Sequence, residues 1–203
     1  MRLGILGGTF DPIHLGHLAV ATVAMNCARL DRVLFIPSAQ PPHRGPASAP
    51  AEDRLQMVRL AVQGEPRYEV SDVEVARGGR SYTVDTVSEL HRDRPDDELF
   101  LILGWDAARL FSTWREPERV SALASVVIVA RPGIKPPTPS ALVATGLPPA
   151  RVIKCIVPTL DVSGSELRRA LAAGESVAGK LPPAVERYIA THHLYRDNQS
   201  VGT

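Results

Sequence analysis

Apolar residues along the chain form two kinds of segment. Short, mainly apolar runs, typical of strands buried on both faces of a sheet, occur at 3–6, 33–36, 99–103, 126–130 and 152–157, and a further strand is suggested near 69–75. Apolar residues at helical spacing fill 15–29, 51–63, 84–92, 166–173 and 184–192. The alternation predicts an α/β fold, a Rossmann-like doubly wound parallel sheet with helices on both faces and a crevice at the carboxyl ends of its strands.

Two proline-rich stretches interrupt this pattern. Residues 37–50 contain five prolines, which exclude a helix or central strand and predict a stiff loop at a strand end. Residues 132–149 read as a surface connection rather than a domain linker, because another buried-looking strand follows them. We therefore expect one domain over 1–196 and a frayed polar tail at 197–203.

Composition narrows the class of protein. With 203 residues, 44% of them hydrophobic and 22% charged, the chain suits one soluble globular domain. A formal net charge of +1 makes nucleic acid a weak candidate partner, so a phosphate ligand must be met by local donors. The chain offers neither a signal-peptide core nor an apolar run of membrane-spanning length, so we expect a cytoplasmic protein that binds no membrane. A homo-oligomer is left open.

The two cysteines stand far apart in the sequence, each in an apolar stretch. Cys27 and Cys155 are interpreted as two packed thiols rather than a disulfide framework or a C-x-x-C metal or redox site.

The most informative segment is G-G-T-F-D-P-I-H-L-G-H at 7–17. Its glycines let the backbone approach a bulky anion, and the helix that follows directs N–H groups and a positive dipole end toward it. His14 and His17 can share one face of the first helical turn and donate to phosphoryl oxygens. Two alternatives are that they only cap or pack the helix start, or form an incomplete metal pair; the strand-turn-helix context favours phosphate. Asp11 is interpreted as shaping the loop.

This segment resembles the nucleotidyltransferase superfamily marked by H-x-G-H, and its full pattern is similar to the nicotinate-mononucleotide adenylyltransferase branch. The resemblance implies transfer of AMP from ATP to nicotinate mononucleotide, which gives nicotinate adenine dinucleotide and pyrophosphate in NAD biosynthesis. It assigns ATP contacts here to Gly7, Gly8, Thr9, Phe10, His14 and His17. Mg²⁺ is implied by the triphosphate, bound mainly through ATP phosphates and water, and no protein metal ligand is expected.

Two further segments match the acceptor side of that branch. P-S-A-Q-P-P-H-R at 37–44 is similar to its P-x-x-x-P-P-H-K loop, which implies phosphate contacts for His43 and Arg44; the arginine keeps the charge but is longer and planar. S-Y-T-V-D-T at 81–86 resembles S-Y-T-x-D-T, which implies that Ser81, Tyr82 and Thr83 hold the nicotinate mononucleotide. By themselves, the first segment is a rigid loop and the second supplies ordinary helix N-caps at Ser81 and Thr83.

Two more segments match in the family's order. Gly104-Trp105-Asp106 resembles its G-x-D, which implies that Gly104 and Asp106 bind ATP, with ribose hydroxyls on Asp106. Trp114 corresponds to a tryptophan that stacks on the nicotinate ring. A core tryptophan and a surface aspartate are the alternative. V-S-G-S-E-L-R at 162–168 looks like I-S-S/A-T-x-I-R, which implies that Ser163, Ser165 and Arg168 hold the triphosphate. Ser163 and Glu166 also form a capping-box pattern.

The implied chemistry needs no protein nucleophile, because the acceptor phosphate is already ionised. The enzyme aligns two anions and stabilises the departing pyrophosphate, a role that the resemblance gives to His14, His17, Arg44 and Arg168. One rival is another H-x-G-H enzyme, acting on phosphopantetheine or on the amide mononucleotide. The other is a non-catalytic nucleotide sensor, whose expected mark is loss of the phosphate-contacting residues. The ending at 181–195 also resembles the family and is interpreted as structural.

Overall fold

Six parallel strands form the sheet in the computed structural model, which describes residues 1–41, 45–130, 137–156 and 162–196. Their order across the sheet is β3-β2-β1-β4-β5-β6. The strands are β1 (Arg2–Gly8), β2 (Arg32–Pro37), β3 (Tyr68–Val70), β4 (Glu98–Gly104), β5 (Ala124–Ala130) and β6 (Val152–Ile156). The chain winds outward in one direction from β1 and in the other from β4, so the carboxyl ends of these two strands flank the crevice.

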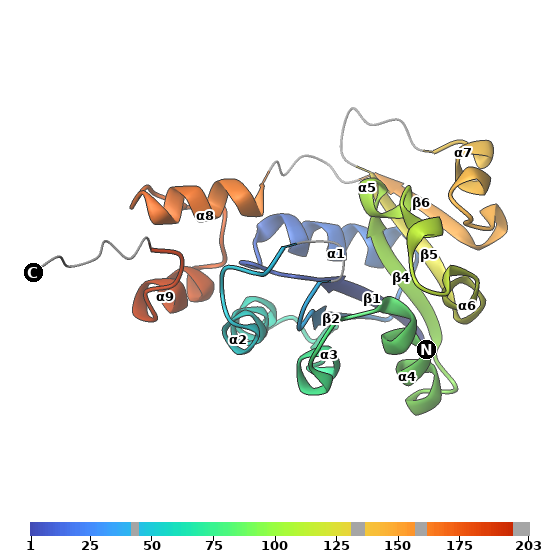
Figure 1. Cartoon of the computed structure of the whole chain (residues 1–203), viewed down its shortest axis with the longest axis horizontal. Coiled ribbons are helices and arrows are strands. Elements are labelled where there is room, and N and C mark those ends of the chain that lie inside the picture. Colours follow the sequence, from blue (N-terminus) through green and yellow to red (C-terminus); the bar gives the residue numbers. More distant parts are fainter. Residues whose placement is uncertain (42–44, 131–136, 157–161, 197–203) are drawn as a thin grey trace, which may run out of the picture.

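Helices cover both faces of the sheet, as predicted (Figure 1). One face carries α1 (Leu15–Cys27), α2 (Ala51–Val62), α8 (Gly164–Ala172) and α9 (Pro183–Thr191). The other carries α3 (Val73–Arg77), α4 (Thr83–Asp93), α5 (Trp105–Ala108), α6 (Pro117–Leu123) and α7 (Pro139–Ala144), with 3₁₀ turns at Phe111–Thr113 and Pro149–Arg151. Successive strand residues alternate between the two layers: Leu34 packs in one core and Phe35 in the other.

Two predicted segments differ from the structure. The strand predicted over 69–75 ends at Val70, and Val73–Arg77 is helical because Val73 packs on the α4 face and Glu74 turns inward to bond Thr86. The connection at 132–149 contains α7, whose start follows ordinary rules: Thr138 accepts a bond from the Ala141 N–H at 3.2 Å, and Pro139 follows it.

The prediction of two separate thiols was wrong. Cys27, at the end of α1, and Cys155, in β6, form a disulfide although 128 residues separate them. Helix α1 packs across the sheet and contacts β6, which brings the two cysteines together. Their separation in the sequence gives no information about this proximity. The predicted tail at 197–203 lies outside the described residues.

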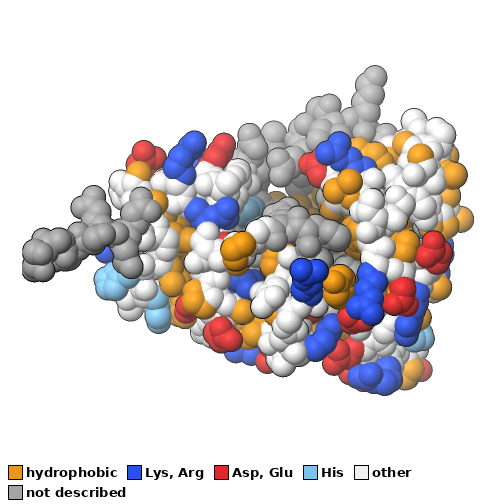
Figure 2. Space-filling model, in the orientation of Figure 1, with side chains coloured by type: hydrophobic (Ala, Val, Ile, Leu, Met, Phe, Trp, Pro, Cys, Tyr) orange, Lys and Arg blue, Asp and Glu red, His pale blue; other side chains and the backbone are white. Residues whose placement is uncertain are grey.

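The surface shows charges of both signs side by side on the face drawn in Figure 2. Among the described helices, none is both long and apolar enough to cross a membrane.

Candidate active site

The two histidines predicted to bind phosphate lie together at the start of α1. His14 is the N-cap residue, and His17 Nδ1 accepts the His14 backbone N–H at 3.3 Å. Their rings stack with centroids 3.7 Å apart and planes inclined by 24°. Because Nδ1 accepts a bond, neutral His17 carries its ring proton on Nε2. The pair thus shares one face of the helix start, as predicted.

Neighbouring residues hold this pair in place. A Cβ on Gly16 would lie 3.0 Å from His14 Nδ1 and 3.1 Å from His14 Cε1, so a side chain there would press on the stacked ring. Phe10 is buried, with φ of 49°, and presents its ring to that of His17 in an edge arrangement at 5.0 Å. Glycine at position 16 therefore avoids a steric clash with the His14 ring.

The loop before the histidines is open on one side. A Cβ on Gly7 would meet no atom within 4 Å, whereas one on Gly8 would lie 3.2 Å from the Phe10 ring. The backbone carbonyl of Thr9 accepts a hydrogen bond from the buried Arg54 side chain. Space for an anion therefore exists in front of Gly7, at the carboxyl end of β1. In the described ranges, no group of three or more His, Cys, Asp or Glu side chains is placed to hold a metal ion.

Asp11 joins this loop to distant parts of the chain. Its carboxylate is 8% exposed and accepts bonds from the Ser48 N–H at 2.7 Å, the Ala49 N–H at 3.1 Å and the Tyr195 hydroxyl at 2.8 Å. Its backbone carbonyl accepts from Arg168 Nη1 at 2.7 Å. Asp11 therefore does more than shape the loop, and Tyr195 gives the C-terminal segment a part in the site.

The start of α8 faces the same loop. Arg168 lies 157 residues from Asp11 in the sequence, yet the two are in contact, so the two segments predicted to bind ATP phosphates come together. Ser163 is the N-cap, but its side chain makes no capping bond, and its Oγ lies 2.8 Å from Ser165 Oγ. The predicted capping box with Glu166 is therefore wrong. Both hydroxyls remain at the helix N-terminus.

The 81–86 segment forms structural hydrogen bonds through its side chains and contains the start of α4. Ser81 Oγ accepts the Ala39 N–H at 3.0 Å, and Thr86 donates to Glu74 Oε1 at 2.6 Å, so these two hydroxyls serve the fold. Helix α4 begins at Thr83 with Tyr82 as its N-cap and no side-chain cap. The predicted caps at Ser81 and Thr83 are therefore wrong, and Ser81 presents a buried side chain.

Trp114 lies near this helix start. The adjacent Arg115 places its guanidinium carbon 4.9 Å from the Tyr82 ring centroid and Nη1 3.8 Å from Asp85 Oδ2. The half-buried Trp114 ring packs against Phe111 at 5.3 Å. Trp114 and the 81–86 segment, both predicted to bind the acceptor, are therefore neighbours in space.

Gly104 ends β4, and Asp106 is exposed on the short α5 that follows, 3.7 Å from Arg109. This position is beside β1 at the point where the sheet order reverses. His43 and Arg44 lie outside the described residues.

One residue of the site region was missed. Arg54 is 1% exposed, and all its hydrogen bonds go to backbone carbonyls: Thr9 at 2.6 Å, Ser38 at 2.7 Å, and Ala39 and Ala49 at 3.1 Å. Desolvation by burial lowers its pKa from the ordinary 12.5. It fastens the loop after β1 to the loop after β2. An arginine in an amphipathic helix normally indicates a solvated face, so the sequence carried no signal of this role.

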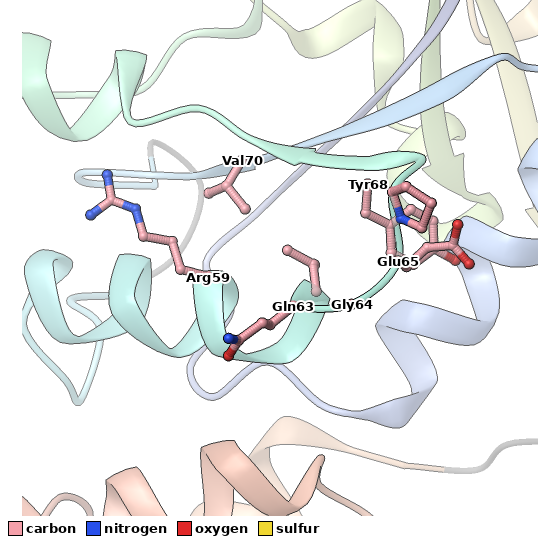
Figure 3. A pocket seen from close by; sticks show the side chains of 8 residues that line it. Arg59, Gln63, Gly64, Glu65, Tyr68 and Val70 are labelled. Carbon is pink, nitrogen blue, oxygen red and sulfur yellow. The ribbon is translucent and has the colours of Figure 1, made fainter.

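A cavity of about 380 Å³ lies apart from these residues, between the end of α2 and β3 (Figure 3). Arg59, Gln63 and Tyr68 help to line it. A second hollow of about 520 Å³ lies between α8 and α9. Neither is lined by a predicted site residue.

The sheet order and the paired histidines at the end of β1 define a nucleotidyltransferase, and the comparison with known families agrees. Residues 5–170 match the model described as cytidylyltransferase-like, so the chain belongs to that family. Within it, the chain belongs with the nicotinate-nucleotide adenylyltransferases. A probable nicotinate-nucleotide adenylyltransferase of Thermus thermophilus is 50% identical, over 97% of this chain and all of the relative. One of Thermomicrobium roseum is 43% identical, over 96% of this chain and 92% of the relative.

Solved structures share the fold. Plasmodium falciparum nicotinic acid mononucleotide adenylyltransferase complexed with NaAD has a TM-score of 0.79, with 96% of this chain and 97% of that one covered, at 20% identity. The same protein complexed with APC gives 0.77.

Proposed function

We propose that this protein transfers the adenylyl group of ATP to nicotinate mononucleotide, releasing pyrophosphate and forming nicotinate adenine dinucleotide for NAD biosynthesis in the cytoplasm. The observation that carries the proposal is the meeting of the His14–His17 pair and Arg168 on one loop at the carboxyl end of β1. The relatives that are up to half identical over nearly the whole chain support this acceptor.

In the reaction, a 5′-phosphate oxygen of the mononucleotide bonds to the α-phosphorus of ATP as the bond to pyrophosphate breaks. The protein supplies donors for charge that grows on the leaving group. His17 offers Nε2–H, α1 contributes its positive dipole end, the start of α8 offers backbone N–H groups, and Arg168 offers a permanent cation. Gly7, Gly8, Thr9 and Phe10 line the approach, Ser163 and Ser165 face the triphosphate, and Arg44 keeps its assigned phosphate contact as a prediction.

Mg²⁺ enters this scheme with its substrate, as the complex with ATP. The Asp11 carboxylate is the acid nearest the histidines in sequence, and three donors already surround it. Mg²⁺ commonly takes most of its ligands from phosphate and water, which fits a site without a carboxylate cluster in the part of the chain that the structure describes.

The acceptor site comprises the start of α4 and Trp114. The first backbone N–H groups of α4, at Thr83 and Val84, precede those that bond the Tyr82 carbonyl and carry the positive dipole end of the helix, which favours a nicotinate carboxylate over the neutral amide. Trp114 supplies a plane for the pyridine ring, Tyr82 lies at the same helix start, and Asp106 accepts bonds from ribose hydroxyls. His43 retains its assigned acceptor contact as a prediction.

The test is pyrophosphate release from ATP and Mg²⁺ with nicotinate mononucleotide, nicotinamide mononucleotide or phosphopantetheine, with the product identified by mass. Turnover chiefly with the nicotinate substrate supports the proposal. Preference for another acceptor would move the protein to a different branch of the family. ATP binding without turnover on any acceptor would support a nucleotide sensor.

A further inference from the structure

Arg168 approaches Asp11 without forming a full ion pair. Arg168 Nη1 donates to the backbone carbonyl of Asp11 at 2.7 Å but remains 3.9 Å from its carboxylate Oδ2. Arginine and carboxylate groups this close commonly pair through two parallel N–H bonds. Something therefore holds the Asp11 carboxylate away from Arg168.

Three uncharged donors hold that carboxylate in its orientation. Oδ1 accepts from the Tyr195 hydroxyl at 2.8 Å and the Ala49 N–H at 3.1 Å, and Oδ2 accepts from the Ser48 N–H at 2.7 Å. Turning the carboxylate toward Arg168 would break these bonds in a nearly buried place, where each unsatisfied group is costly. The guanidinium of Arg168 is left with a carbonyl as its hydrogen-bond acceptor on Asp11 and with 34% of its side chain exposed.

We propose that Tyr195 is a positioning residue that keeps Arg168 available for the triphosphate of ATP by holding the Asp11 carboxylate turned away from it. This inference rests on the proposed function. A phosphate competes more easily with one neutral carbonyl for a guanidinium than with a bidentate carboxylate. The C-terminal segment after α9 thereby tunes ATP affinity without touching the nucleotide.

Tyr195 is suited to this task because it remains a donor. Burial, together with the neighbouring Asp11 charge, raises the pKa of its hydroxyl far above the ordinary 10.0. The hydroxyl therefore keeps its proton at all physiological pH values.

The test is Tyr195→Phe, with affinity for a non-hydrolysable ATP analogue and steady-state kinetics as readouts. Without the Tyr195 hydroxyl, only the two backbone N–H groups hold the carboxylate, which can turn toward Arg168 more easily. The dissociation constant of the analogue and the KM for ATP should therefore rise about fivefold, as the loss of about one hydrogen bond implies. kcat at saturating ATP and the KM for nicotinate mononucleotide should stay near those of the unmodified protein.

Tyr188→Phe is the matched control. Tyr188 lies on α9 and donates to Asp53 Oδ1 at 2.8 Å, so its substitution removes the same kind of bond away from Arg168. A purely structural role for Tyr195 predicts that both variants lose thermal stability alike and bind the analogue normally. That result would overturn the proposal.

A double-variant cycle with Arg168→Gln tests the route of the effect. If Tyr195 acts through Arg168, Tyr195→Phe should change analogue affinity little when Arg168 is already replaced. An undiminished effect in that background would overturn the proposal. The unmodified protein is also tested for formation of nicotinate adenine dinucleotide. If no product forms, the proposed function is wrong. If product forms but Tyr195→Phe binds the ATP analogue with unchanged affinity, only the inference about Tyr195 is wrong.

Discussion

The imidazole rings of His14 and His17 lie face to face, 3.7 Å apart between centroids, with the His14 backbone N–H donating to His17 Nδ1. The contact fixes the orientation of the His17 ring at the helix start and places the ring proton of neutral His17 on Nε2. In the proposed reaction, such a fixed pair would act on developing charge without reorganising.

His17→Ala should lower kcat about 100-fold while the thermal midpoint changes little, because it removes a donor to the transition state and only a half-buried side chain. Steady-state pyrophosphate release and a thermal melt measure the two effects. His91→Ala, an exposed histidine on α4, is the control for loss of an imidazole. Unchanged turnover in His17→Ala would remove His17 from the catalytic set.

Arg54→Met should destabilise the fold by about 3–5 kcal/mol, because four backbone carbonyls lose their buried donor. Arg59→Met is the control on the same helix, where an exposed pair with Asp72 at 3.4 Å contributes at most about 1 kcal/mol. Urea unfolding of both variants measures the difference. Equal decreases in the free energy of unfolding would show that the carbonyl contacts of Arg54 stabilise the fold no more than the exposed Arg59–Asp72 pair does.

Glu74→Gln should become more stable relative to the unmodified protein as the pH rises. Burial raises the pKa of Glu74 above the ordinary 4.5, so the folded state holds that proton more tightly than the unfolded chain does. The stability contributed is complete below pH 4.5 and is lost as the pH rises through the folded pKa.

Glutamine mimics the neutral acid and keeps the acceptor for Thr86, so it avoids this loss. Urea unfolding at about pH 4.5 and about pH 7.5 tests the sign, with the exposed Glu118→Gln as a control for the change in charge. A stability difference that shrinks toward neutral pH would contradict the prediction.

The Cys27–Cys155 disulfide should contribute about 3–5 kcal/mol to the free energy of unfolding, because it closes a long loop in the unfolded chain. Cys27→Ser with Cys155→Ser should melt at a lower temperature and keep its turnover near room temperature, since neither cysteine belongs to the site. Thiol titration in guanidinium should find free thiols only after reduction. Two titratable thiols before reduction would contradict the cross-link.

Periodicity predicted the layers because each element has one environment that its own residues determine. The run at 33–36 is apolar throughout and lies in the middle of the sheet, as its composition requires. The short helix α3 was missed because its environment depends on other parts of the chain. It holds only five residues, and Glu74 turns inward to bond Thr86, which follows twelve positions later. The side-chain caps expected at Ser81 and Ser163 do not form because other groups bond to these hydroxyls. Ser81 accepts the N–H of Ala39, 42 positions away in the sequence, and the Ser163 hydroxyl lies on that of Ser165, two positions along.

The sequence by itself determined the chemistry of the site: glycines at an anion-binding turn, two histidines three positions apart, and an arginine one turn into a later helix. These features are local, so spacing along the chain suffices to recognise them. Only the tertiary structure decided which distant groups meet. It placed Tyr195 and Arg168 on Asp11, buried Arg54 among carbonyls of two loops and joined Cys27 to Cys155. Such contacts depend on how the sheet brings the ends of its strands together, which no local pattern encodes.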